Sequence, residues 1–228
     1  MILCLKILSV ILRFYRIKLK TEENQQAHWG RYMNIRLYAI KEGITKLGPG
    51  LRFGIWTQGC TRHCHGCMTP DSQPLDQGYL MAIEDLALKI ISSGRTEITI
   101  SGGEPFLQAK QLTKLIDIIQ KEIDLGVIIY TGFTHEELVQ SSNDDFLKLL
   151  DKCDLLVDGA YDESLNDGKN LRGSSNQRAI PLTERYKEFS AEFGTKPAEV
   201  EFFFQEEKVS MVGVPSAEVL KRFKNTIF

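Results

Sequence analysis

From residue 33 onward, short apolar runs alternate with longer amphipathic stretches, and this alternation most constrains the fold. Runs of that length suit buried strands, and the stretches between them have the spacing of amphipathic helices. The pattern is typical of βα units on a parallel sheet. At 228 residues the chain is long enough for one well-buried core and too short for two generous domains. We expect one α/β domain, with strands over 33–40, 52–57, 97–101, 127–130, 154–157, 199–205 and 208–214, and helices over 82–93, 109–124, 134–150 and 217–224.

Polar and glycine-containing segments follow the expected strands. They comprise a cysteine-rich loop after residue 57, Gly102 to Pro105, Thr131-Gly132 and Asp158-Gly159. In parallel sheets, ligands bind where the strands reach their carboxyl ends, so these loops are expected to meet at one site. A long polar loop over 162–177 is also expected to be functional, because structureless loops of that length are uncommon in compact domains.

Three cysteines, Cys60, Cys64 and Cys67, lie within eight residues. Thiolates are soft ligands that select zinc or iron–sulfur centres, and three can hold three irons of a cubane while the fourth iron stays open. A zinc-stabilised binding module without catalysis is the alternative, with His63 or His65 as fourth ligand. Zinc ribbons usually carry paired Cys-x2-Cys knuckles and this chain has no second pair, so the spacing favours the cluster.

The remaining composition narrows the class of protein. Cys4 and Cys153 are expected to be small buried hydrophobes without chemistry. Bunched cysteines do not make a disulfide framework, so a reducing, cytoplasmic location is expected. The net charge is −2 although residues 1–20 carry five basic and no acidic side chains, so the rest of the chain is acidic. This balance gives no support for nucleic-acid binding and favours a protein or small-molecule partner.

Residues 1–32 are expected to be an N-terminal extension, and 33–228 a catalytic domain that ends in a strand–strand–helix extension. The apolar run over 1–12 is interrupted by Lys6 and is shorter than the roughly 20 residues of a membrane span. Its charges follow the apolar stretch, which a secretory signal does not show. Two alternatives remain: a basic surface helix, or a misassigned start codon with Met33 as the true first residue.

The cysteine spacing, together with Gly102-Gly103-Glu104-Pro105 after the next strand, resembles the radical S-adenosylmethionine enzymes. The resemblance implies an incomplete (β/α)6-type barrel, with a mostly parallel sheet and outer helices. It also implies that Cys60, Cys64 and Cys67 bind a [4Fe-4S] cluster whose fourth iron chelates S-adenosylmethionine. Gly102, Gly103 and Glu104 would lie against the methionyl amine, since glycines permit close backbone approach and a carboxylate accepts hydrogen bonds from an ammonium group. Without the cysteines, this segment would be interpreted as an ordinary strand-to-helix turn.

Over residues 33–183 the chain further resembles the activating enzymes of anaerobic (class III) ribonucleotide reductase. The matching pieces are Gly48 to Arg52, Trp56 to Cys60, Gly66, Tyr130 to Leu138, Leu156 to Gly159 and Leu171 to Arg178. The resemblance implies that an outside donor such as reduced flavodoxin supplies an electron, and that a 5′-deoxyadenosyl radical then takes hydrogen from a glycine of a partner reductase or another glycyl radical enzyme. Segment 68–74 and the residues after 190 depart from the family. They suggest a radical reaction on a peptide or small molecule as the alternative.

Two further residues are expected at the cofactor site. Asp158 follows a strand, and Arg172 belongs to a loop rich in Arg, Ser, Asn and Gln. Such a loop could grip an anionic carboxylate, a ribose or the backbone of a partner. Asn176-Gln177-Arg178 could instead order the loop itself.

Overall fold

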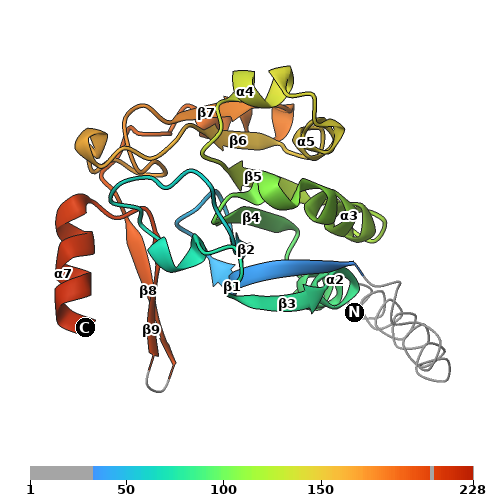
Figure 1. Cartoon of the computed structure of the whole chain (residues 1–228), viewed down its shortest axis with the longest axis horizontal. Coiled ribbons are helices and arrows are strands. Elements are labelled where there is room, and N and C mark those ends of the chain that lie inside the picture. The colour runs from blue at the N-terminus through green and yellow to red at the C-terminus, as the bar shows by residue number, and fades with distance from the viewer. Residues whose placement is uncertain (1–32, 206–207, 228) are drawn as a thin grey trace.

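A computed structural model describes residues 33–205 and 208–227. The predicted extension over residues 1–32 lies outside this range. The described chain is a mixed α/β fold around a seven-stranded sheet in the order β3-β1-β2-β4-β5-β6-β7 (Figure 1). Its strands are β1 (Asn34–Ile44), β2 (Arg52–Thr57), β3 (Tyr79–Ala82), β4 (Glu97–Gly102), β5 (Gly126–Tyr130), β6 (Leu155–Asp158) and β7 (Arg178–Pro181).

The sheet is parallel at its centre and antiparallel at its edges. β2, β4, β5 and β6 pair in parallel, as the βα pattern predicts. β1 pairs antiparallel with β2 and β3, and β7 pairs antiparallel with β6. Neither β3 nor β7 was expected from the sequence. In the described part of the chain these two edge strands do not pair with each other, so the sheet is open.

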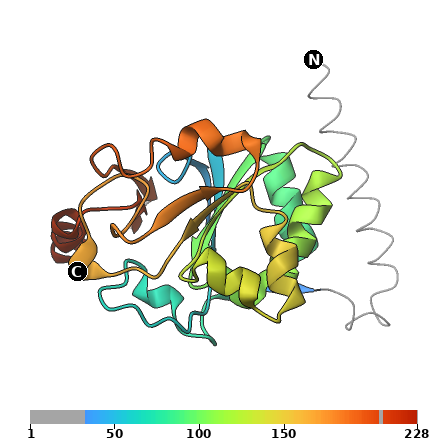
Figure 2. The same cartoon turned by 90° about the horizontal axis from the view of Figure 1, so that it is seen from above.

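One face of the sheet carries the main core. Alternate strand residues point to this face, among them Ile55, Ile100 and Ile129, and all three are fully buried. They pack against helices whose apolar residues recur at helical spacing. Figure 2 shows these helices gathered along that side of the sheet. They are α2 (Ile83–Ser92), α3 (Ala109–Gln120), α4 (His135–Gln140) and α5 (Asp144–Leu150).

The expected single helix over 134–150 is two helices, which corrects the prediction. Thr134 does cap the first one: its hydroxyl accepts from Glu137 N, and the Glu137 carboxylate accepts from Thr134 N. α4 ends at Gln140. A separate helix, α5, begins at Asp144, because the Asn143 side chain accepts from Asp145 N and acts as a second N-cap.

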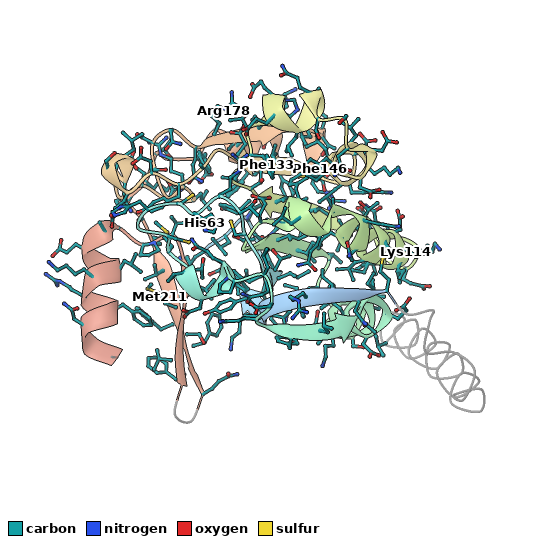
Figure 3. All side chains as sticks on the ribbon, in the orientation of Figure 1. His63, Lys114, Phe133, Phe146, Arg178 and Met211 are labelled. Carbon is teal, nitrogen blue, oxygen red and sulfur yellow. The ribbon has the colours of Figure 1, made fainter. Side chains whose placement is uncertain are left out.

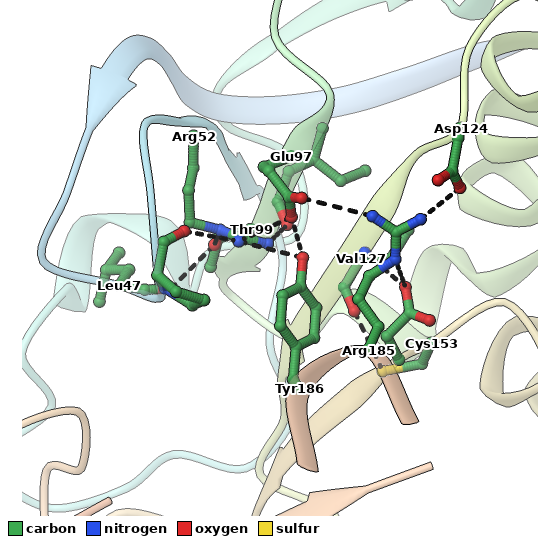
Figure 4. A network of polar contacts seen from close by, with 12 residues as sticks. Leu47, Arg52, Glu97, Thr99, Asp124, Val127, Cys153, Arg185 and Tyr186 are labelled. Carbon is green, nitrogen blue, oxygen red and sulfur yellow. Dashed lines mark hydrogen bonds and ion pairs between the residues drawn. The ribbon is translucent and has the colours of Figure 1, made fainter. Parts of the chain in front are cut away.

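The opposite face of the sheet holds a buried polar network near the amino ends of β2 and β4 (Figure 4). The Arg52 side chain is fully buried; it donates to Thr99 Oγ1 at 2.6 Å, to Glu97 Oε2 at 3.0 Å and to Tyr186 Oη at 3.1 Å. Thr99 donates in turn to the carbonyl of Leu47 at 2.9 Å. The Gly48 to Arg52 motif is thus placed at the start of β2. The cysteine loop begins only after Thr57, which is about 16 Å further along an extended strand.

The C-terminal residues form a separate two-stranded sheet and a helix, as expected. These are β8 (Val200–Gln205), β9 (Lys208–Gly213) and α7 (Ala217–Ile227), preceded by the short helix α6 (Lys187–Ser190). Figure 1 shows the hairpin and α7 side by side at the edge of the molecule away from α2 and α3. Phe202 and Phe223 join them, with ring centroids 5.8 Å apart. Within the described residues, no helix is long and apolar enough to cross a membrane.

Candidate cluster and cofactor site

A cavity of about 200 Å³ opens at the carboxyl ends of β2, β4 and β5. All four loops that the sequence analysis expected to meet there reach its wall, because parallel strands end at the same edge. Six of the lining residues were predicted to bind the cluster or the methionyl amine: Cys60, Cys64, Cys67, Gly102, Gly103 and Glu104. The apolar part of the wall includes Leu47, Trp56, Met68, Tyr130, Met211, Val212, Val214, Pro215 and Leu220.

The chain itself holds the cysteine loop in place. Gly59 N donates to Ser72 O at 2.8 Å, and Cys60 N donates to Gln73 O at 2.9 Å, so the loop folds back onto the segment that follows it. All three thiols are free and half-buried. Burial raises the pKa of Cys60 and of Cys64. Such thiols stay protonated near neutral pH unless a metal binds the thiolate form. Cys153, by contrast, is buried in the helix-side core, as predicted.

These residues fit an iron–sulfur cluster. In the described ranges, no three or more His, Cys, Asp or Glu side chains gather closely enough to hold one metal ion. The three cysteines line the same cavity without converging on a single point. A tetrahedral zinc ion needs four ligands at about 2.0–2.3 Å from one centre, whereas a cubane is bound through separate irons. Three thiols from one loop that line one cavity match the second case.

The two glycines at the end of β4 are needed for packing beneath the cysteine loop. Gly102 has φ +111°, and a Cβ added there would lie 2.4 Å from Thr57 N. A Cβ at Gly103 would lie 2.2 Å from Gly59 O. The close approach that the glycines permit is therefore to the backbone around Gly59, immediately before the first cysteine. Both glycines also line the cavity.

Glu104 joins two of the loops through its carboxylate. Oε1 accepts from Phe106 N at 3.0 Å and from Thr131 Oγ1 at 2.8 Å, and Oε2 accepts from Gly132 N at 2.8 Å. Burial raises the pKa of Glu104, while these hydrogen bonds favour its ionised form. A carboxylate has about four lone-pair sites and three are used here, which leaves room for one more donor from the cavity.

Arg62 is a site residue that the sequence analysis missed. From the cysteine loop, its guanidinium lies 3.9 Å from the ring centroid of Phe133 and donates to Glu137 Oε2 at 2.9 Å. Its Nε is buried and has no hydrogen-bond partner in the described structure. Arg62 thus ties the cysteine loop to the start of α4 and keeps one donor beside the cavity. No sequence pattern links residues some seventy positions apart.

The structure does not bring Asp158 and Arg172 into this cavity. The Asp158 carboxylate is buried beneath Arg178, which donates to Oδ1 at 3.0 Å, and it also accepts from His135 N at 2.8 Å. Figure 3 shows Arg178 above Phe133, close to α4. Asp158 lines a neighbouring polar cavity that shares Arg62, Gly132 and Gly159 with the first. Arg172 pairs with Asp167.

The distinctive segment over 171–178 orders its own loop. Gln177 Oε1 accepts from Gly173 N at 2.7 Å, and its Nε2 donates to Gly159 O at 2.8 Å. Asn176 donates to Ala160 O at 2.8 Å. Leu171 adopts the left-handed conformation, with φ +66°. The backbone here is therefore held by side chains of the motif itself, the second of the two roles considered for Asn176-Gln177-Arg178.

The fold and the site together define a cysteine-ligated iron–sulfur protein with an α/β core. A family model described as a 4Fe-4S single cluster domain matches residues 46–180. The chain belongs to this family and, within it, to the activating proteins of anaerobic ribonucleoside-triphosphate reductase. The predicted resemblance to radical S-adenosylmethionine enzymes, with their cluster and S-adenosylmethionine as cofactors, is confirmed. The zinc-stabilised binding module is not supported.

Three relatives are named anaerobic ribonucleoside-triphosphate reductase-activating protein. The one from Vibrio cholerae is 31% identical over 140 residues, which cover 57% of this chain and 87% of the relative. The one from Escherichia coli K12 is 30% identical, covering 57% and 88%, and the one from Enterobacteria phage T4 is 27% identical, covering 60% and 88%. The solved structure of QueE from Escherichia coli aligns with 47% of this chain and 60% of its own, at 21% identity and a TM-score of 0.39.

Proposed function

We propose that this chain is the activating enzyme of an anaerobic ribonucleotide reductase or of a related glycyl radical enzyme. The observation that carries the proposal is one cavity lined by three free cysteines and by Gly102 to Glu104, in a chain at least 30% identical to two such activating proteins. When bound, the [4Fe-4S] cluster and S-adenosylmethionine supply reductive sulfonium cleavage and hydrogen abstraction. We further infer that the open sheet is an incomplete barrel, and that residues 33–228 act as one cytoplasmic catalytic domain.

The chain's own residues then bind and orient the cofactors. The cysteines would ligate three irons, and Glu104 would accept a hydrogen bond from the methionyl ammonium on its remaining lone pair. Arg62 offers its unpartnered Nε–H to an anionic group in the cavity, such as the cofactor carboxylate. Trp56 and Tyr130 cover the inner side with apolar surface, and water excluded there strengthens every ionic contact inside. Binding and orientation of this kind can lower the activation free energy by several kcal/mol.

A second candidate is a radical reaction on a peptide or small molecule. It is favoured by one observation: the cavity wall includes residues 211–215 and Leu220, which lie beyond the stretch that the family model matches. A wall absent from the family pattern could serve a different hydrogen donor. The electron donor, for which flavodoxin is the expectation, is common to both candidates.

The experiment is anaerobic reconstitution, reduction in the presence of S-adenosylmethionine and quantification of 5′-deoxyadenosine. Cys64→Ala should abolish the product. Cys153→Ala is the matched control and should retain it, because that thiol is buried in the helix-side core and does not line the cavity. A glycyl radical signal on added anaerobic ribonucleotide reductase would support the first candidate. Formation of 5′-deoxyadenosine without that signal would favour the second candidate. A protein with an intact cluster that forms no 5′-deoxyadenosine would contradict both candidates.

A further inference from the structure

The C-terminal hairpin and helix supply one side of the cofactor cavity. Five apolar residues do so and are called here the C-terminal wall: Met211, Val212, Val214, Pro215 and Leu220. Met211, labelled in Figure 3, and Val212 belong to β9; Val214 and Pro215 form the connection; and Leu220 belongs to α7. None of them falls within residues 46–180, the stretch that the family model matches.

The wall is fixed to the rest of the fold. Val212 and Val214 are buried against Ile44 and Leu47, next to the β1–β2 connection. The Glu201 carboxylate, from the paired strand β8, accepts from Thr45 N at 2.7 Å and from Lys46 N at 3.1 Å. Buried apolar contacts and charge-assisted hydrogen bonds therefore hold the hairpin on one side.

A second attachment comes from the long polar loop. Asn166 donates from its amide to the carbonyl of Pro215 at 3.4 Å and to Tyr161 Oη at 3.3 Å. At the end of β9, Gly213 has φ +125°, and a Cβ added there would lie 2.5 Å from Glu199 O. The strand thus turns toward the cavity at a position that only glycine fits. Loops on both sides of the cavity hold the wall, so it is a built part of the site.

The chemistry of the cavity shows what the wall faces. The polar side chains of the lining, among them the cysteines, Glu104, Arg62, Gln73 and Gln177, belong to other segments, while the five residues of the C-terminal wall are apolar. Small-molecule sites combine a few placed polar groups with a mostly apolar lining. S-adenosylmethionine has a charged amino-acid end that suits the polar groups and a less polar adenosyl end that needs apolar cover.

We propose that the C-terminal wall contacts bound S-adenosylmethionine directly and excludes water from it, as an addition to the family's own binding residues. This inference rests on the proposed function, because it takes S-adenosylmethionine as the ligand of the cavity. Contact with the wall removes apolar surface of both partners from water, which stabilises the bound state in proportion to the area covered. The wall is therefore a determinant of cofactor affinity, while the cysteines determine cluster binding.

The test is the Kd of cluster-loaded, full-length protein for S-adenosylmethionine, measured by calorimetry. Met211→Ser removes roughly two methylene equivalents of contact, and we expect the Kd to rise about tenfold. Val214→Thr keeps the side-chain shape while adding a hydroxyl, and the Kd should rise several-fold. Phe204→Ser is the matched control: Phe204 lies on the same hairpin, is 77% exposed and does not line the cavity, so its Kd should match the wild type.

Hydrogen exchange gives a readout that does not depend on turnover. In the wild type, S-adenosylmethionine should slow exchange at amides 211–214 and leave amides 202–204 unchanged. The proposal about the C-terminal wall would be overturned if both Met211→Ser and Val214→Thr kept the wild-type Kd and S-adenosylmethionine gave the wild type no protection at amides 211–214. The proposed function would then remain intact. A wild type that binds no S-adenosylmethionine and forms no 5′-deoxyadenosine would instead overturn the proposed function.

Discussion

Replacing Arg52 by methionine should destabilise the protein by about 3 kcal/mol, at the lower end of the range for breaking a buried ion pair. The Arg52 side chain is fully buried and donates to Thr99, Glu97 and Tyr186. Methionine has a similar length and is apolar, so the main loss is electrostatic. Because the network lies near the amino ends of β2 and β4, and the cofactor cavity lies at their carboxyl ends, the change should lower stability more than cofactor binding.

The magnitude follows from what each partner loses. Thr99 keeps its bond to Leu47, and Tyr186 keeps its contact with Glu97, so neither hydroxyl is left unpaired. Glu97 retains Arg185 at 3.4 Å and is partly exposed, which softens the cost of its uncompensated charge. A buried acceptor or charge that loses its partner costs about 1–3 kcal/mol, and the lost pair itself adds to this.

The assay is urea unfolding of the cluster-free protein, followed by circular dichroism. Arg222→Met is the matched control, since the Arg222–Glu218 pair is more than two-thirds exposed on both sides. Such a pair contributes about 0–1 kcal/mol. Adding Glu97→Gln to Arg52→Met should recover part of the loss, because it removes the charge left behind. A loss of unfolding free energy below about 1 kcal/mol for Arg52→Met would refute the reasoning that this network stabilises the face of the sheet opposite the helices.

Three further predictions follow from the site. Glu104→Gln should raise the Kd for S-adenosylmethionine about tenfold or more, because a neutral amide attracts the ammonium less and turns an N–H toward Gly132 N; an unchanged Kd in calorimetry would contradict the assigned role. Arg62→Ala should lower the free energy of unfolding by about 1 kcal/mol through loss of its ring contact and its exposed ion pair, and no shift of the urea midpoint would count against the tie. Arg178 holds the pKa of Glu136 at about 2, so this pair stabilises the fold at pH above the ordinary pKa of 4.5, and the stabilisation is lost as the pH falls toward 2. Glu136→Gln removes this carboxylate and keeps Arg178 on Asp158, so it should flatten the acid limb of unfolding followed by circular dichroism; an identical limb in both proteins would exclude the pair as its cause.

The central strands were predictable because each is a short apolar run bounded by a polar motif. β2, for example, has the bounds that the sequence indicates, Arg52–Thr57. The edge strands β3 and β7 were not, since each has four residues and little alternation, and each forms only because a longer strand is there to pair with. The break between α4 and α5 does have a local signal, Asn143 before two acidic residues, but apolar spacing continues across it and outweighed the cap.

The site was predictable where chemistry and spacing coincide. The three cysteines and Glu104 meet in one cavity because they follow neighbouring parallel strands. Asp158 is the last residue of such a strand, β6, yet its side chain points to Arg178 and not into that cavity. Position along the chain fixes the edge of the sheet at which a residue lies. It does not fix the direction of its side chain, which depends on partners that are distant in sequence.

The bonds that hold the cysteine loop run between parts of the chain, from Gly59 to Ser72 and from Glu104 N to Gly59 O. Because these bonds join parts of the polypeptide, we expect the start of the loop to lose its conformational entropy when the chain folds. Zinc fingers differ, because there metal binding and folding are one event. For this chain we expect the cluster to bind a loop whose first residues are already in place, so an iron–sulfur carrier would deliver the cluster to a folded protein.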